Sequence, residues 1–153
     1  MIAQGSAGAM EPRGKFHDDA FSLVREANRM CQQGRGAEAE KHYRRALGEL
    51  EEVFGPDHLE VAGCLNNMGV CMRDLGRQIE AQHMHRRALR IRQALLGREH
   101  PDVAMSLNNL ASCLYDLGDL QEAQPMLRRA LDIAVKTLGE DHPLTLNVRA
   151  NLR

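Results

Sequence analysis

Histidine is the residue type in this sequence with the broadest chemistry, because a neutral imidazole binds metal ions and exchanges protons near neutral pH. Three histidines recur at one interval: His58, His100 and His142 are separated by 100 − 58 = 42 and 142 − 100 = 42 residues. A single metal ion holds its ligands at about 2 Å, and side chains one whole repeat apart cannot meet that condition. Two of the three directly precede a proline that opens a helical pattern, so we expect these histidines to cap helices.

Other catalytic patterns are missing from the sequence. His83 and His85 are two residues apart, which places them on different faces of a helix rather than in a zinc pair. The sequence contains no nucleophile elbow, no phosphate-binding glycine loop and no HExxH segment. Its carboxylates are spread over helix faces that we expect to be exposed. These features favour a protein that is not an enzyme and that has no metal or cofactor.

Three arginine pairs also follow the 42-residue interval, and a basic ladder of this kind could grip phosphate groups. They are Arg44-Arg45, Arg86-Arg87 and Arg128-Arg129. However, Glu40 stands four residues before Arg44, the net charge is −1 and aromatic residues make up only 3% of the chain. Binding to nucleic acid or to an anionic membrane calls for a basic excess. We therefore expect a solvated helix face here, and neither nucleic acid nor membrane as a partner.

Two adjacent asparagines occur twice, as Asn66-Asn67 and Asn108-Asn109. Asparagine is a poor helix former that competes for backbone hydrogen bonds, so a repeated pair within a helical pattern requires another role. Its amide group donates through nitrogen and accepts through oxygen, which suits it to hold the backbone of an extended peptide. The alternative is that these amides tie neighbouring repeats together, and both roles can hold at once.

The 42-residue repeat extends to glycines and predicts pairs of helices. Gly55, Gly97 and Gly139 keep the interval, and each is suited to the positive-φ residue that ends a helix. In the third copy the pattern predicts one helix over 101–117 and a second over 121–138. Neither helix can bury its apolar stripe alone, so successive hairpins must stack.

Small residues recur where the paired helices would touch. Ala27, Gly69 and Ala111 lie twelve residues before Ala39, Ala81 and Ala123, which lie seven residues before Ala46, Ala88 and Ala130. Together with the LGxxHP linker and the LNNLA segment, this signature resembles the tetratricopeptide repeat family in its kinesin-light-chain-like form. The resemblance implies an all-α, right-handed superhelical solenoid of three helical hairpins plus a terminal helix.

In the resembled family the first helices of the hairpins line a concave groove that binds protein ligands, and the matching positions here form the candidate site. These positions are Arg25, Asn28, Asn66, Asn67, Val70, Arg73, Asn108, Asn109, Ser112 and Tyr115. Arg25 and Arg73 are the evident charges, so we expect a peptide with an acidic residue beside an apolar one. Some members hold a chaperone's C-terminal carboxylate in a basic and asparagine clamp. Val24, Met105 and Asn109 replace cations of that clamp, which disfavours this ligand.

Domain boundaries follow from the repeat. The expected boundaries are 1–14 for a flexible tail without periodicity, 15–153 for the repeat domain, about 18–56, 57–98 and 99–140 for the repeats, and 142–153 for the terminal helix. Two rival interpretations are a homo-oligomer formed by stacking of repeat ends and the sensor portion of a larger signalling protein.

The four cysteines indicate a cellular compartment. Cys31, Cys64, Cys71 and Cys113 form no CxxC pair, and the sequence shows neither a secretory signal nor an apolar run of membrane-spanning length. We therefore expect reduced, buried thiols in a cytoplasmic protein.

Overall fold

The computed structural model describes residues 13–152 of the chain, with side chains described over 19–152. These residues form only helices and turns, which confirms the all-α prediction. The helices are α1 (Arg13–Gln32), α2 (Gly36–Phe54), α3 (Leu59–Asp74), α4 (Gln78–Leu96), α5 (Pro101–Asp116), α6 (Leu120–Leu138) and α7 (Pro143–Asn151). None of these described helices has the length and apolar character needed to cross a bilayer. Of the expected tail, residues 1–12 lie outside the described residues, and residues 13 and 14 belong to α1.

Histidines and glycines mark the helix ends, as the repeat predicts. The Nδ1 atoms of His58, His100 and His142 accept hydrogen bonds from the backbone N–H two residues further on, at 3.2, 3.0 and 3.1 Å. Each histidine thereby satisfies one of the unpaired N–H groups of the first helical turn. The glycines that close the preceding helices have positive φ, for example +84° at Gly97. Because the linkers share one geometry, each hairpin is displaced and rotated relative to the previous one by a similar amount.

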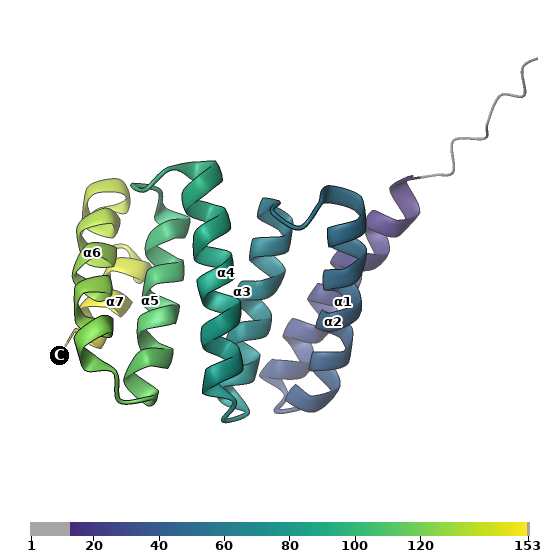
Figure 1. The fold of residues 1–153 in the computed structure, drawn as a ribbon, viewed down its shortest axis with the longest axis horizontal. Helices are drawn as coiled ribbons and strands as arrows, with labels where there is room; N and C mark the ends of the chain where they lie inside the picture. The colour runs from purple at the N-terminus through teal and green to yellow at the C-terminus, as the bar shows by residue number, and fades with distance from the viewer. Residues whose placement is uncertain (1–12, 153) are drawn as a thin grey trace, which may run out of the picture.

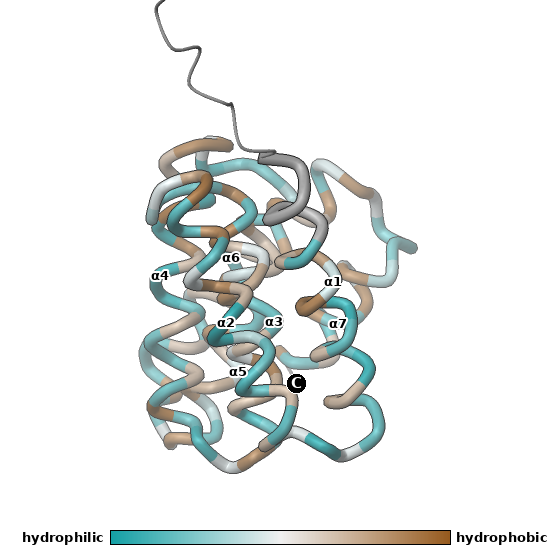
Figure 2. The backbone as a smooth tube through the Cα atoms, turned by 90° about the vertical axis from the view of Figure 1, so that its right-hand side faces the viewer, coloured by the Kyte–Doolittle hydropathy of each residue, from teal (hydrophilic) through white to brown (hydrophobic). Residues whose placement is uncertain are grey.

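The helices form two layers along the long axis of the molecule (Figure 1). In the first layer, α1, α3, α5 and α7 each contact the next helix of the layer. In the second layer, α2, α4 and α6 make no such contacts with one another within the described part of the chain. Figure 2 shows α4 on one side of the stack and α1 and α7 on the other. A stack whose helices are close in one layer and apart in the other curves toward the close layer. The first layer therefore lines the inner face.

Small side chains let the two layers approach closely. Eight alanines of the repeat signature have 0% exposure: Ala27, Ala39, Ala46, Ala81, Ala88, Ala111, Ala123 and Ala130. Larger apolar side chains such as Leu50, Met72 and Leu127 fill the space around them and are also buried. A bulkier residue at any of the alanine positions would have to displace a packed neighbour.

The arginine pairs lie on the solvent side of the second layer, which confirms the expectation of a solvated face. Arg44 pairs with Glu40 at 2.7 Å, and Arg45 pairs with Glu49 at 3.0 Å. The two arginine side chains are 55% and 67% exposed. Ion pairs this exposed contribute little to stability, because water and salt screen them.

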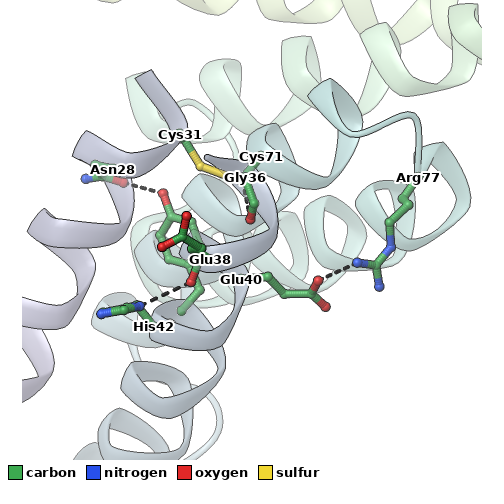
Figure 3. Close-up of a disulfide and its surroundings, with 9 residues drawn as sticks. Asn28, Cys31, Gly36, Glu38, Glu40, His42, Cys71 and Arg77 are labelled. Atoms are coloured by element: carbon green, nitrogen blue, oxygen red, sulfur yellow. Dashed lines mark hydrogen bonds and ion pairs between the residues drawn. A yellow bond between two sulfur atoms is a disulfide. The ribbon is translucent and has the colours of Figure 1, made fainter. Parts of the chain in front are cut away.

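The prediction of reduced cysteines is right for two residues and wrong for the other two. Cys64 and Cys113 are free and buried, and burial raises their pKa to about 12 and about 11. Cys31 of α1 and Cys71 of α3 instead form a disulfide, with Cα atoms 6.1 Å apart (Figure 3). Their separation of 40 residues matches neither the repeat interval nor a CxxC spacing. Only the stacking of α1 against α3 brings the two side chains together.

Candidate functional site

Asparagine side chains form a ladder along the inner face. Asn109 Nδ2 of α5 donates to Asn66 Oδ1 of α3 at 2.8 Å. Asn108 Nδ2 donates to Asn147 Oδ1 of α7 at 2.9 Å, and Asn151 Nδ2 donates back to Asn108 Oδ1 at 2.9 Å. Asn66 and Asn108 are only 5% exposed, and a buried amide without a partner costs about 1–3 kcal/mol. The ladder therefore ties the first helices of successive repeats.

Asn67 is the equivalent of Asn109 one repeat earlier, but it makes no such bond. The position that would pair with it in α1 is Val24, because 66 − 42 = 24, and an apolar side chain accepts no hydrogen bond. Among the described residues the Asn67 side chain has no hydrogen-bond partner, and it is half-buried. Its two N–H donors and its carbonyl oxygen are all available to a ligand.

Two cavities open along the inner face, one between α1 and α3 and one between α3 and α5 that also reaches α7. The α1–α3 cavity has a volume of about 270 Å³ and is lined by Asn28, Cys31, Gln32, Tyr43, Asn67, Val70, Cys71 and Asp74. The α3–α5 cavity has a volume of about 240 Å³ and is lined by Val70, Arg73, His85, Asn108, Asn109, Ser112, Asn147 and Asn151. Val70 is 42% exposed and lines both cavities. The cavities are therefore adjacent parts of one groove.

The disulfide fixes the geometry of the α1–α3 cavity. It joins α1 to α3 directly at the cavity wall, beside Asn28 (Figure 3). The Tyr43 hydroxyl of α2 donates to Asn28 Oδ1 at 2.5 Å. Burial raises the pKa of Tyr43 to about 12, so its hydroxyl stays protonated and able to donate. Covalent and hydrogen-bonded links thus hold this part of the groove in place before any ligand arrives.

Of the two charges expected in the groove, one is paired and one is not. The Arg73 guanidinium donates to both carboxylate oxygens of Asp116, through Nε at 2.5 Å and Nη2 at 3.3 Å. Arg25 donates to the Ser22 hydroxyl at 3.0 Å, and no carboxylate of the described residues pairs with it. Of these two arginines, Arg25 on α1 is thus the one without a carboxylate partner among the described residues.

The structure brings most of the predicted site residues together. Asn28, Asn67, Val70, Arg73, Asn108, Asn109 and Ser112 line one or both cavities. Asn66 joins them through its bond to Asn109. Arg25 and Tyr115 line neither cavity.

Three residues of the α3–α5 cavity were not predicted from the sequence. Asn147 and Asn151 lie one interval after Met105 and Asn109, because 105 + 42 = 147 and 109 + 42 = 151. The repeat could have located both. His85 belongs to the second layer, and nothing in its spacing indicates that it reaches the inner face.

Comparison with known families decides where this arrangement belongs. The tetratricopeptide repeat profile matches residues 18–94, 65–134 and 102–152, which together span most of the chain. The chain belongs to the tetratricopeptide repeat family. Tetratricopeptide repeats are generally non-catalytic and act as scaffolds that bind protein partners. The groove lined by amide side chains is thus the inner face of a tetratricopeptide repeat stack.

Solved structures show the same fold and the kinesin-light-chain-like type of repeat. BtubC (BKLC) from P. vanneervenii has a TM-score of 0.83 and 26% identity, over 94% of this chain and 57% of that chain. A putative kinesin light chain from Podosopora anserina has a TM-score of 0.79 and 24% identity, over 86% of this chain and 63% of that chain. The Yersinia enterocolitica translocator chaperone SycD has a TM-score of 0.67 and 20% identity, over 89% of each chain. This tetratricopeptide repeat chain thus spans less than two thirds of the first two proteins. A search of curated protein sequences gives no significant match.

Proposed function

We propose that this tetratricopeptide repeat domain is a non-enzymatic scaffold that binds an extended peptide segment of a partner protein in the groove formed by the two cavities. The observation that carries the proposal is the Asn67 amide, which faces the α1–α3 cavity without a partner among the described residues. An amide in that position can donate to and accept from a peptide backbone whatever the peptide's side chains are.

The groove also indicates the character of the peptide. Arg25 lines neither cavity, but it lies on α1 three residues before Asn28 of the cavity wall and has no carboxylate partner among the described residues. Val70 presents an exposed apolar side chain between the two cavities. A peptide with an acidic residue beside an apolar one complements this surface. The asparagine ladder holds α3, α5 and α7 in one arrangement, so less ordering entropy opposes binding.

Substitution of the groove asparagines tests the proposal. The probe is a peptide selected by the wild-type domain from a phage-displayed library of random linear peptides. Asn67→Ala should weaken binding roughly tenfold, by loss of hydrogen bonds, and leave the melting temperature unchanged. Asn109→Ala should lower both the affinity for the peptide and the melting temperature, because it leaves the buried Asn66 oxygen unpaired.

Gln124→Ala removes an amide from an exposed position of α6 and serves as the control. It should change neither binding nor melting temperature. If Asn67→Ala lowers stability as much as it lowers affinity, the residue has a structural role and the proposal fails.

A second candidate function is self-association through α7, which would assemble copies of the chain end to end. The observation that favours it is Leu146, an apolar side chain of α7 that is 50% exposed. Light scattering over a concentration series tests this candidate. A stable oligomer that prevents binding of the selected peptide would count against peptide capture.

A third candidate is that this chain is the sensor portion of a larger signalling protein. It is kept because the matched part is only 57% of the BtubC chain. Sequencing the full-length gene tests it.

We propose a cytoplasmic location, and the disulfide provides its test. Cytoplasmic thiols are kept reduced by glutathione and thioredoxin systems. Alkylation of intact cells should therefore label both Cys31 and Cys71. A Cys31–Cys71 disulfide that resists labelling in intact cells would contradict the location.

A further inference from the structure

His85 of α4 is a buried imidazole at the wall of the α3–α5 cavity. It is 1% exposed, and neither Nδ1 nor Nε2 has a hydrogen-bond partner among the described residues. It nevertheless lines the α3–α5 cavity, where the other lining residues belong to first-layer helices. Buried polar groups are almost always paired, so an exception at a cavity wall requires an explanation.

The equivalent residues of the other repeats are satisfied. Because 85 − 42 = 43 and 85 + 42 = 127, they are Tyr43 and Leu127. The Tyr43 hydroxyl pairs with Asn28, and Leu127 has no polar atom. The residue that corresponds to Asn28 beside His85 is Val70, since 28 + 42 = 70, and it cannot pair. The second repeat therefore has a polar side chain at this position but an apolar one where the first repeat has its hydrogen-bond partner.

Gly69 makes room for His85 at the cavity. Its equivalents, Ala27 and Ala111, carry a methyl group at this place in the stack. A Cβ atom at Gly69 would lie 2.7 Å from both Cε1 and Nε2 of His85, closer than such atoms can approach. The ring edge that carries Nε2 therefore occupies the space of the missing methyl group. Gly69 and His85 depart from the repeat pattern together, and the departure brings an imidazole from the second layer to the groove.

Burial, with help from two nearby positive charges, keeps the His85 ring neutral. Burial lowers the pKa of His85 to about 4, and the guanidinium groups of Arg92 and Arg73 act in the same direction. Arg92 is itself 8% exposed and donates to the Ser106 hydroxyl at 2.8 Å. A neutral imidazole offers one N–H donor and one nitrogen acceptor.

The rest of the cavity also offers donors and acceptors in a nearly neutral setting. The asparagine amides around His85 use only part of their capacity within the ladder. Among the described lining residues there is no carboxylate, and the guanidinium of Arg73 is paired with Asp116. A carboxylate ligand would bring acceptors alone and an ammonium group donors alone, whereas a carboxamide brings both. Building on the proposed function, we propose that the α3–α5 cavity binds the side-chain carboxamide of an Asn or Gln of the groove-bound peptide, with His85 as the residue that selects it.

Variants copied from the third repeat separate this role from packing. His85→Leu introduces the side chain of Leu127, and the double variant Gly69→Ala/His85→Leu also restores the methyl group of Ala111. Both remove an unpaired buried polar group, so both should melt at or above the wild-type temperature. His83→Leu makes the same change at an exposed position of α4 and serves as the matched control.

The same library of random linear peptides supplies the probe. The wild-type domain should enrich peptides with Asn or Gln at one fixed position. Synthetic copies of the enriched peptide should lose roughly tenfold or more in affinity when that residue is changed to Glu or Ala. The His85→Leu domain should bind the unchanged peptide with a similar loss, and the His83→Leu domain with none.

The outcomes distinguish this inference from the function on which it rests. If His85→Leu binds the enriched peptide as tightly as the wild type, or if Glu is preferred to Gln, the carboxamide site is refuted. The groove proposal then stands as long as Asn67→Ala still weakens binding. If the wild-type domain enriches no peptide at all, the proposed function fails and this inference fails with it.

Discussion

Reduction of the Cys31–Cys71 disulfide would show how much the link between α1 and α3 stabilises the stack. The bond closes a loop of 40 residues. The chain-entropy expression, −2.1 − 1.5R ln n, then gives about −13 cal/mol/K, or about 4 kcal/mol at 25 °C. A domain of this size shifts its melting temperature by about 2–4 °C per kcal/mol. Reductant should therefore lower the melting temperature by up to about 16 °C.

The assay is a circular dichroism melt with and without a phosphine reductant. Cys31→Ala should melt like the reduced wild type, because Cys31 is only half-buried and its truncation leaves little empty space. The variant should not respond to reductant, because it has no Cys31–Cys71 bond to break. Cys64 and Cys113 do not complicate the result, since burial raises their pKa and keeps them as unreactive thiols.

Hydrogen exchange locates the effect along the stack. Each repeat contacts only its neighbours, so reduction should speed exchange in α1 and α2 more than in α6. If reductant leaves the wild-type melting temperature unchanged, or shifts Cys31→Ala by the same amount, the entropic reasoning is refuted.

Three further predictions concern packing, capping and pH. Ala88→Leu should cost about 1–3 kcal/mol in urea unfolding, because Ala88 has 0% exposure and the added atoms have no space; an unchanged midpoint would contradict the close contact. His100→Ala should cost about 1 kcal/mol by loss of the bond from the Asp102 N–H, and His83→Ala on the surface should cost much less. Folding lowers the pKa of His85 from 6.5 to about 4. The neutral ring therefore contributes fully to the free energy of unfolding above about pH 6.5. That contribution, roughly 3 kcal/mol, is lost as the pH drops to about 4. Lowered carboxylate pKa values, such as that of Glu40 beside Arg77, give both proteins some pH dependence. The difference in unfolding free energy between wild type and His85→Leu, measured in urea, should therefore change by this amount between about pH 6.5 and pH 4.

The repeat made most of the fold predictable. The interval of 42 residues located the hairpins, and the predicted helices at 101–117 and 121–138 agree with Pro101–Asp116 and Leu120–Leu138 to within one residue at each end. Helix ends were predictable because the capping histidines and positive-φ glycines act locally, through neighbours in the chain.

The missing parts of the site depend on contacts between repeats. Cys31 and Cys71 meet only because α1 lies against α3, and periodicity does not specify which side chains meet across that contact. His85 interrupts an apolar stripe, and its spacing alone does not distinguish a defect from a functional group. Its meaning depends on Gly69 and Val70 together, which the fold places beside it.

Three of the hydrogen-bonded pairs that join first-layer helices share one offset, whereas the Asn108–Asn147 bond spans 39 residues. Asn66–Asn109, Asn108–Asn151 and Arg73–Asp116 each connect residues 43 apart, one more than the interval of the repeat. The Asn108-Asn109 pair therefore bonds in both directions, through Asn109 to the repeat before it and through Asn108 to the helix after it. Deleting or duplicating a block of 42 residues between two such bonds would leave the bonded amides opposite other amides. A repeat array joined in this way can gain or lose whole repeats during evolution, because each new contact between repeats again places an amide donor opposite an amide acceptor.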